Sequence, residues 1–308
     1  MKLSIIATLY NSAPYITEFY QRARSAARQL VGNDYEIILV NDGSPDNSLD
    51  IVVELTEAES DIVVVDLSRN FGHHKAMMTG LSYATGEKIF LLDSDLEEEP
   101  EWLKLFDEKL KQNKCDVVYG VQETRKGGWF ERWLGSLYYF LMVLITSVDF
   151  PRNITTARLM SRRYVDGLLL HKEQEMVISG LWAITGFTQC SQVVKKHSIS
   201  PSTYNIFSKF IHLANTITSF SARPLLFIFY TGVIIFILST GYALNLIIRH
   251  IFFSQTVDGW TSLMVSIWLL GGIVISFIGI IGIYLAKVYT ETKNRPYVVV
   301  REVYSNDR

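Results

Sequence analysis

The stretch Phe90-Leu-Leu-Asp-Ser-Asp-Leu-Glu-Glu-Glu-Pro-Glu101 predicts the end of a buried strand, a group of carboxylates and the start of a helix. Asp93 and Asp95 would then emerge at the carboxyl end of a strand, where open α/β sheets bind ligands. Two such carboxylates repel each other unless a cation lies between them, and their hard oxygens suit Mg2+ or Mn2+ that also holds substrate phosphates. The pattern favours a metal-diphosphate site, and a solvated acidic turn is the alternative.

Short apolar runs on either side of this stretch predict an α/β fold. The predicted strands are Leu3–Thr8, Glu36–Asn41, Ile62–Leu67, Lys88–Leu92 and Asp116–Val121, with segments of helical length between them. Continuous apolar strands, each followed by a helix, indicate a mostly parallel sheet covered on both faces. The sequence contains neither Gly-x-Gly-x-x-Gly nor a Walker lysine loop, so it supports neither the dinucleotide fold nor a phosphate-loop ATPase.

Polar residues follow the first three predicted strands, at the same edge of the sheet as Asp93. Tyr10 can stack on a base, and Asp42 can accept a hydrogen bond from a base N–H or a ribose hydroxyl. Asn-Asp-Gly-Ser at 41–44 also fits an ordinary turn that caps a helix. After the third strand, the cations and the helix start in residues 69–75 are suited to an anion.

Composition indicates a membrane protein. The 308 residues are 49% hydrophobic with a net charge of −2, so nothing supports nucleic-acid binding through bulk positive charge. The uncharged runs Leu225–Ile248 and Ser262–Ala286 are long enough for two transmembrane helices. Cations lie mainly outside the loop between them, which predicts both termini in the cytoplasm. Glycines in the second run allow close helix packing, so a homo-oligomer is expected.

The two cysteines, Cys115 and Cys190, are far apart in sequence and match no metal-ligand spacing. We expect them to be reduced thiols in the core of a cytoplasmic domain. The apolar N-terminal run is too short for a signal peptide, which agrees with that location.

A basic and aromatic segment, Arg125 to Trp133, precedes the apolar run Leu134–Val148. Cations and tryptophans that open an apolar helix are typical of a helix lying in the lipid headgroup layer. A buried core helix is the alternative.

Three motifs in one order carry a family resemblance: Asn-Asp-Gly-Ser at 41–44, Ser-Arg-Asn-Phe-Gly at 68–72 and Asp-Ser-Asp-Leu at 93–96. The chain resembles the inverting GT-A glycosyltransferases of family 2. More narrowly, it is similar to the branch that loads a sugar onto a polyprenyl phosphate, which includes dolichol-phosphate mannose synthase and GtrB-type enzymes. The resemblance implies four parts: a GT-A core at 1–124, an acceptor-binding juxtamembrane region at 125–223, two transmembrane helices at 224–286 and a cytoplasmic tail at 287–308.

The resemblance also implies site residues. Nucleotide binding would fall to Thr8, Tyr10, Ser12, Asp42 and Asp93, metal binding to Asp93, Asp95 and Glu97, acceptor-phosphate binding to Arg125, Lys126, Arg132 and Arg158, and catalysis to Asp95 and Arg158.

The chain departs from the family pattern at several of these positions. Thr156 stands where an aspartate is usual, Thr8 where proline is common, Ser12 where an acid is common and Glu97 where glutamine is frequent. The missing acid need not abolish activity, because a phosphate monoester has a second pKa of about 6 and is already an anionic nucleophile at neutral pH.

The implied function is transfer of a sugar, from a UDP-linked donor by resemblance, to undecaprenyl phosphate with inversion. It would take place on the cytoplasmic face of a bacterial inner membrane and supply a surface glycan such as O-antigen. A processive polysaccharide synthase is one alternative, although the Gln-x-x-Arg-Trp motif expected of it is missing at Ser179–Trp182. A non-catalytic scaffold or flippase partner is the other, favoured by Thr156 and Ser12.

Overall fold

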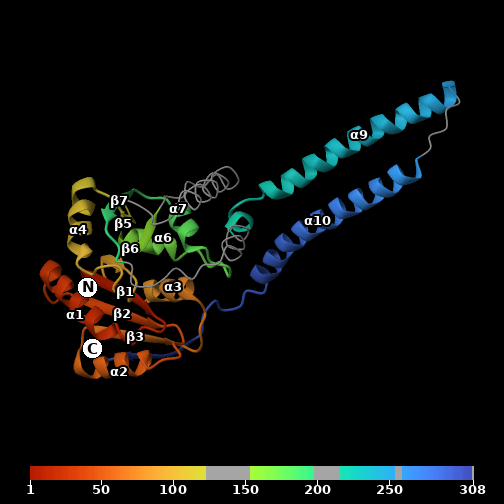
Figure 1. Ribbon diagram of the computed structural model, residues 1–308. Helices are drawn as coiled ribbons and strands as arrows, with labels where there is room; N and C mark the ends of the chain where they lie inside the picture. The colour runs from red at the N-terminus through yellow and green to blue at the C-terminus, as the bar shows by residue number, and fades with distance from the viewer. Residues whose placement is uncertain (123–152, 198–215, 254–258, 307–308) are drawn as a thin grey trace. The chain divides into compact units, whose positions relative to one another are not determined.

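The computed structural model describes residues 1–122, 153–197, 216–253 and 259–306 (Figure 1). These residues divide into two compact units. The first comprises residues 1–122, 153–197 and 295–306, and the second comprises residues 216–294 without the undescribed loop.

The first unit is built on one eight-stranded sheet with the order β7-β5-β6-β4-β1-β2-β3-β8. The strands are β1 (Leu3–Leu9), β2 (Tyr35–Asn41), β3 (Ile62–Leu67), β4 (Lys88–Leu91), β5 (Val117–Gln122), β6 (Ile154–Ser161), β7 (Gln189–Val194) and β8 (Val300–Ser305). The neighbouring strands β4, β1, β2 and β3 are all parallel, whereas β6 runs antiparallel to both β4 and β5. The five predicted strands are confirmed to within a residue or two at their ends, and β6, β7 and β8 are additional.

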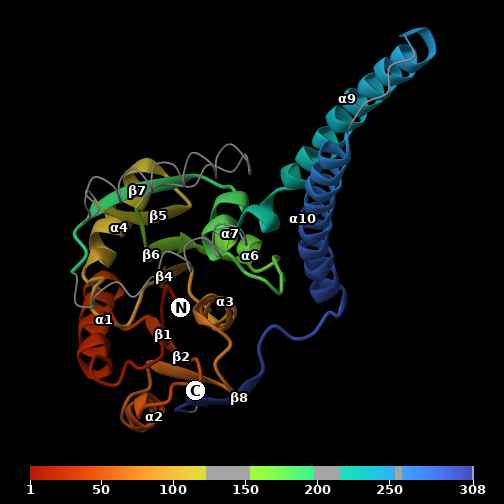
Figure 2. The ribbon, with the colours of Figure 1, turned by 45° about the vertical axis from the view of Figure 1, so that its right-hand side comes forward.

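Helices cover both faces of this sheet. They are α1 (Ile16–Val31), α2 (Ser48–Ala58), α3 (His73–Tyr83), α4 (Trp102–Asn113), α6 (Arg162–Leu168) and α7 (Ile178–Ile184). Helix α1 packs between α2 and α4, and α3 packs against β1 and β2 (Figure 2). The apolar runs in the strands are continuous because alternate residues face opposite helices: Ile5 belongs to the core cluster under α1, whereas Ile6 contacts α3 at Gly80.

Helix α1 buries an amphipathic stripe against the sheet. Its buried residues are Ile16, Phe19, Tyr20, Ala23 and Ala27, which recur three or four positions apart. This spacing places them on one side of a 3.6-residue helix, while Glu18 and Arg22 lie on the outer side.

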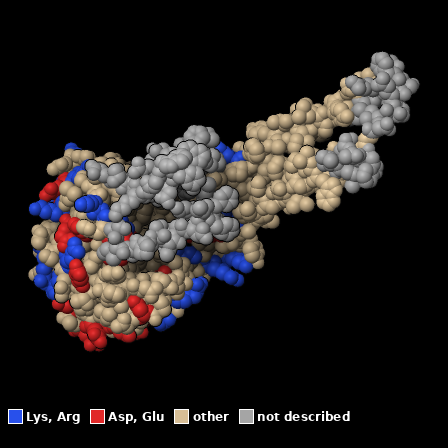
Figure 3. Space-filling model, viewed as in Figure 1, with Lys and Arg blue, Asp and Glu red and all other residues tan. Residues whose placement is uncertain are grey.

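The second unit contains two long helices, α9 (Arg223–Phe253) and α10 (Trp260–Thr292). Within them, Arg223–Tyr242 and Ser266–Thr292 are long and apolar enough to cross a membrane, with mean hydropathies of 2.0 and 2.4. None of either apolar window is buried inside the protein, and Figure 3 shows few charged side chains along their visible length. Burial in lipid would account for such exposed apolar surface.

The expectation of reduced, unpaired cysteines is wrong. Cys115 and Cys190 form a disulfide with their Cα atoms 6.2 Å apart. Cys115 lies two positions before the start of β5, and Cys190 lies in β7, the parallel neighbour of β5. The pairing of β5 with β7 therefore brings together two cysteines with a sequence separation of 75, which sequence spacing could not show.

Candidate functional site

A small pocket of about 130 Å³ lies where β1, β2 and β3 end. Its lining residues are Thr8, Leu9, Tyr10, Asp42, Asn70, Gly72 and His73. Parallel strands bring their carboxyl ends to one edge of a sheet, so three segments distant in sequence meet there. The pocket contains Thr8, Tyr10 and Asp42 of the predicted nucleotide-binding set.

Asp42 holds two loops of this pocket together. Its buried carboxylate accepts hydrogen bonds from the backbone N–H groups of Phe71 at 2.7 Å and Gly72 at 3.0 Å. Burial raises the pKa of Asp42, and these two N–H donors oppose the rise. The loops are so close that a Cβ atom on Gly43, whose φ is +60°, would lie 2.4 Å from the nitrogen of Asn70. The turn therefore requires glycine for both its conformation and its space.

The end of β1 is fixed by serines beneath the pocket. Ser12 Oγ accepts from the Tyr10 N–H and lies 3.1 Å from Ser94 Oγ, which donates to the carbonyl of Thr8. Ser12 is buried and is not among the pocket-lining residues. Tyr10 is 51% exposed, so its ring remains available to stack on a base.

The acids after β4 surround a cation from the chain itself. Asp93 lies 3.2 Å from His73 Nε2, and Thr8 Oγ1 lies 2.9 Å from the other nitrogen of that imidazole. Lys196 Nζ lies 4.0 Å from Asp93 and 3.2 Å from Glu97. Asp95 instead accepts a hydrogen bond from the Glu97 N–H at 3.0 Å. The predicted metal ligand Glu97 is therefore paired with Lys196.

Charges in this cluster shift one another's pKa values. Burial would raise the pKa of Asp93, but the nearby His73, Lys196 and Thr156 outweigh burial and lower it. Burial raises the pKa of Asp95, and the charge of Asp93 adds to the rise. Burial would lower the pKa of Lys196, but the surrounding carboxylates raise it. Asp93 therefore stays ionised, and the raised pKa values of Asp95 and Lys196 indicate that the cluster favours further positive charge.

The carboxylates fit a hard divalent cation. Asp93 Oδ1 is buried and, although it lies 3.2 Å from His73 Nε2, forms no hydrogen bond among the described residues. Mg2+ is commonly held by one or two carboxylates together with substrate phosphates. Asp93 and Asp95 supply that number, although in the described part of the chain no three His, Cys, Asp or Glu side chains surround a common point.

Arg158 lies inside the domain, with only 2% of its surface exposed. Its guanidinium carbon is 2.8 Å from the ring centroid of Trp182, and its nitrogens donate to the carbonyls of Thr155 and Thr156. Burial lowers the pKa of Arg158 to about 9, against the opposing effect of Tyr164 and Glu98. The predicted catalytic arginine is therefore buried against Trp182 and the backbone of β6, and it is not among the residues that line the pocket.

Thr156, which replaces the usual aspartate, reaches the same cluster. Its backbone N–H donates to the buried Glu98 at 2.9 Å, and its side chain helps to lower the pKa of Asp93. Burial raises the pKa of Glu98 to about 7, and the charge of Asp93 adds to the rise.

Three predicted acceptor residues, Arg125, Lys126 and Arg132, lie outside the described residues. The structure also places at the site residues to which the sequence assigned no role: Asn70, Gly72, His73, Ser94, Glu98, Trp182 and Lys196. Asn70 and His73 follow β3 and belong to the segment 69–75, which the sequence indicated as suited to an anion without assigning these two residues a role. Lys196 follows β7, a strand that was not predicted, so no local signal pointed to it.

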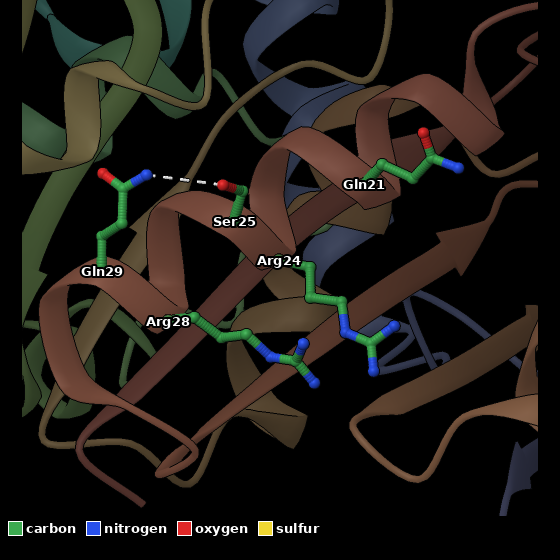
Figure 4. A pocket seen from close by; sticks show the side chains of 5 residues that line it. All are labelled: Gln21, Arg24, Ser25, Arg28 and Gln29. Atoms are coloured by element: carbon green, nitrogen blue, oxygen red, sulfur yellow. Dashed lines mark hydrogen bonds between the residues drawn. The ribbon is translucent and has the colours of Figure 1, made fainter.

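A second hollow of about 380 Å³ lies on the outer side of α1 (Figure 4). It is lined by side chains of this one helix, among them Arg24 and Arg28. Arg24 is already paired with Glu59 and Asp61. This hollow contains none of the strand-end residues and is not a candidate for the same chemistry.

Comparison with known proteins identifies the family of this chain. The family profile described as glycosyl transferase family 2 matches residues 4–169. A Mycobacterium tuberculosis protein that bears a glycosyltransferase name is 48% identical over 100% of this chain and 90% of its own length. The prophage bactoprenol glucosyl transferase homolog of Escherichia coli is 32% identical over 98% of this chain and 99% of its own. The bactoprenol glucosyl transferase of Shigella phage SfII is 30% identical over 98% of each.

Solved structures support the fold. A mannosyltransferase from Pyrobaculum calidifontis, solved with GDP-Man and Mn2+, superposes with a TM-score of 0.50 at 17% identity and covers 70% of this chain and 62% of its own. At that identity the likeness concerns the fold, which is a GT-A-like α/β domain. The chain belongs to glycosyl transferase family 2 and is a glycosyltransferase.

Proposed function

We propose that this enzyme transfers a sugar from a nucleotide donor to undecaprenyl phosphate, with inversion at the anomeric carbon. The observation that carries the proposal is the strand-end pocket next to Asp93 and Asp95, in a chain that matches bactoprenol glucosyl transferases from end to end. Bactoprenol is undecaprenol, so these relatives make a lipid-linked sugar. A chain of this family with the same overall length and two apolar helices is suited to the same class of acceptor.

The donor site follows from the pocket. In this proposal Tyr10 stacks on the base, and Asp42 uses its remaining lone pairs to accept from the base or ribose. The N-terminus of α3, where Gly72 and His73 lie, faces the pocket and favours an anionic diphosphate. A UDP-sugar is the proposed donor.

Asp93 and Asp95 would hold Mg2+ or Mn2+, with Glu97 as a further ligand if it leaves Lys196. When bound, the metal supplies positive charge against the departing nucleoside diphosphate. Among the chain's own groups, His73 and Lys196 lower the pKa of Asp93 and so keep it ionised, and Lys196 adds positive charge at the same place. The site thereby favours the charge that develops as the sugar–phosphate bond breaks.

The acceptor phosphate needs no aspartate at position 156 in this mechanism. A phosphate monoester is largely anionic at neutral pH and can attack the anomeric carbon itself. The enzyme has to orient it and compensate its charge, for which Lys196, Arg125, Lys126 and Arg132 are the proposed groups, while the buried Arg158 steadies the acid cluster. Thr156 then serves as a neutral hydrogen-bonding partner of Asp93.

The two apolar helices would anchor the enzyme in the bacterial inner membrane, with the catalytic domain and both termini in the cytoplasm. Positive residues outside the loop between the helices favour that orientation. Homo-oligomers and a lipid flippase that receives the product are the proposed partners, and the product would feed assembly or modification of a surface glycan.

A transfer assay tests this function. Purified full-length protein in detergent is incubated with undecaprenyl phosphate, Mg2+ or Mn2+ and a panel of radiolabelled nucleotide sugars, and label is followed into the organic phase. We expect metal-dependent transfer from one donor. Asp95→Asn should reduce the rate at least a hundredfold, an effect of the order seen when a transition-state charge partner is removed.

Glu101→Gln is the matched control, because Glu101 belongs to the same acidic segment but pairs with Arg22 on the outer surface. It should transfer sugar at the wild-type rate. If the folded wild-type protein moves no label from any donor, or if Asp95→Asn is as active as Glu101→Gln, the proposed function is refuted.

A further inference from the structure

The C-terminal tail returns to the catalytic domain after the second apolar helix. Strand β8 adds to the sheet antiparallel to β3, with Val63 opposite Ser305 and Val65 opposite Val303 (Figure 2). The register shifts between Asp66 and Leu67, immediately before the loop that enters the donor pocket. Irregular pairing of this kind is common next to active sites, where it redirects the chain.

Arg301 of β8 makes two contacts with the end of β3 and the start of the following loop. One guanidinium nitrogen lies 3.1 Å from Asp66 Oδ2, and another donates to the carbonyl of Ser68 at 2.8 Å. The Asp66 side chain is fully buried, whereas that of Arg301 is 55% exposed. The Ser68 N–H also donates to the carbonyl of Val299 at 2.9 Å. The tail thus fixes the start of the loop 68–72, whose residues Asn70 and Gly72 line the pocket.

Hydrogen bonds link the Arg301–Asp66 ion pair to the other two pocket loops. Asp66 Oδ1 accepts from Asn41 Nδ2 at 2.8 Å, and Asn41 Oδ1 accepts from the Ser44 N–H at 3.2 Å. Ser44 Oγ in turn accepts from the Asn11 N–H at 2.8 Å, next to Tyr10. A continuous chain of polar contacts therefore runs from the tail to the ends of β2 and β1.

We propose that Arg301 is a positioning residue for the donor site, so that the C-terminal strand controls the affinity for the nucleoside diphosphate part of the donor. Without the guanidinium, the carboxylate of Asp66 is left buried with its charge uncompensated. We expect the loops attached to it to move so that the carboxylate reaches solvent. Arg301 acts through Asp66 and Ser68 and does not itself contact the nucleotide. This inference rests on the proposed function, because it assigns nucleotide binding to the pocket.

The test compares two arginine variants of the full-length protein in detergent. Arg301→Ala removes the tail contact. Arg163→Ala is the matched control, because Arg163 is also an exposed arginine paired with a buried aspartate, Asp116, but it lies at β6 and α6 away from the pocket loops. UDP and GDP are titrated calorimetrically with Mg2+ present, and thermal unfolding is recorded for each protein.

We expect both variants to lose thermal stability, whereas only Arg301→Ala loses nucleotide affinity, by roughly 3- to 30-fold. Arg301→Lys, which keeps the charge, should recover most of that affinity. In the transfer assay Arg301→Ala should raise KM for the donor with little change in kcat.

Equal nucleotide affinity in Arg301→Ala and wild type would overturn the inference alone and leave β8 as a structural strand. Equal loss of affinity in Arg163→Ala would also overturn it, because the effect would then follow general stability. Failure of the wild-type protein to bind either nucleotide would refute the proposed donor site and the inference with it.

Discussion

Replacement of Asp42 by asparagine should weaken nucleotide binding by opening the donor pocket. The carboxylate receives two backbone N–H donors, from Phe71 at 2.7 Å and Gly72 at 3.0 Å. Asparagine offers one oxygen, so one of these donors would face an NH2 group instead. A hydrogen bond to a charged group contributes about 1.5–3 kcal/mol. We therefore expect a loss of about 2 kcal/mol in the free energy that holds the loop 69–72 in place.

That loss predicts a tenfold or greater rise in the Kd for UDP, because about 1.4 kcal/mol corresponds to a factor of ten. The assay is calorimetric titration of UDP with Mg2+ into the full-length protein, together with thermal unfolding. Asp107→Asn is the matched control: Asp107 is equally buried and charged, but it lies on α4 and pairs with Lys88 and Lys111. This control should lower the unfolding temperature and leave the Kd unchanged.

The reasoning is refuted if folded Asp42→Asn protein binds UDP as tightly as the wild type. It is also refuted if Asp107→Asn weakens binding to the same degree, since the loss would then reflect a general loosening of the domain.

Three further predictions concern the acid cluster, the arginine beneath it and the turn after β2. Lys196→Met removes the cation that competes with metal for Asp93 and Glu97, so Mn2+ affinity measured by electron paramagnetic resonance should rise roughly tenfold, or about 1.4 kcal/mol; an unchanged or weaker affinity would contradict this. Trp182→Ala uncovers the buried Arg158 and should lower the free energy of unfolding by about 3–5 kcal/mol. Trp182→Phe keeps a ring for stacking and should lower it clearly less. Equal unfolding temperatures for the two variants would disprove the stacking role. Burial would raise the pKa of Asp46, but hydrogen bonds from Ser44, Ser48 and the Ala13 N–H lower it to about 2. Because the folded pKa lies below the ordinary 3.8, this stabilisation should be complete above pH 4 and be lost as the pH falls toward 2, and Asp46→Asn should lack that part of the acid transition in thermal unfolding.

Local sequence signals were sufficient for the parallel half of the sheet. Strands β1 to β4 are mostly apolar because helices cover both faces, and each ends in a polar turn that marks its boundary. The same signals located Asp93 and Asp95 at a strand end and Asp42 in a neighbouring loop. The pocket contains three of the predicted nucleotide residues for this reason.

Contacts between distant segments carried no such signal. Lys196 reaches Asp93 only because β7 joins the sheet beside β5, and the same pairing brings Cys190 to Cys115. Arg301 meets Asp66, which lies far away in the sequence, because the tail returns as β8. Arg158 was located by its motif, but its burial under Trp182 depends on α7, which the sequence pattern did not single out.

The product of the reaction tests the central claim most directly. Wild-type protein is incubated with the active nucleotide sugar, undecaprenyl phosphate and metal, and the lipid product is analysed by mass spectrometry and by proton and phosphorus NMR. The account predicts a single sugar linked through one phosphate to undecaprenol, with the anomeric configuration opposite to that in the donor. A lipid diphosphate, a retained configuration or a sugar chain of several units would contradict it.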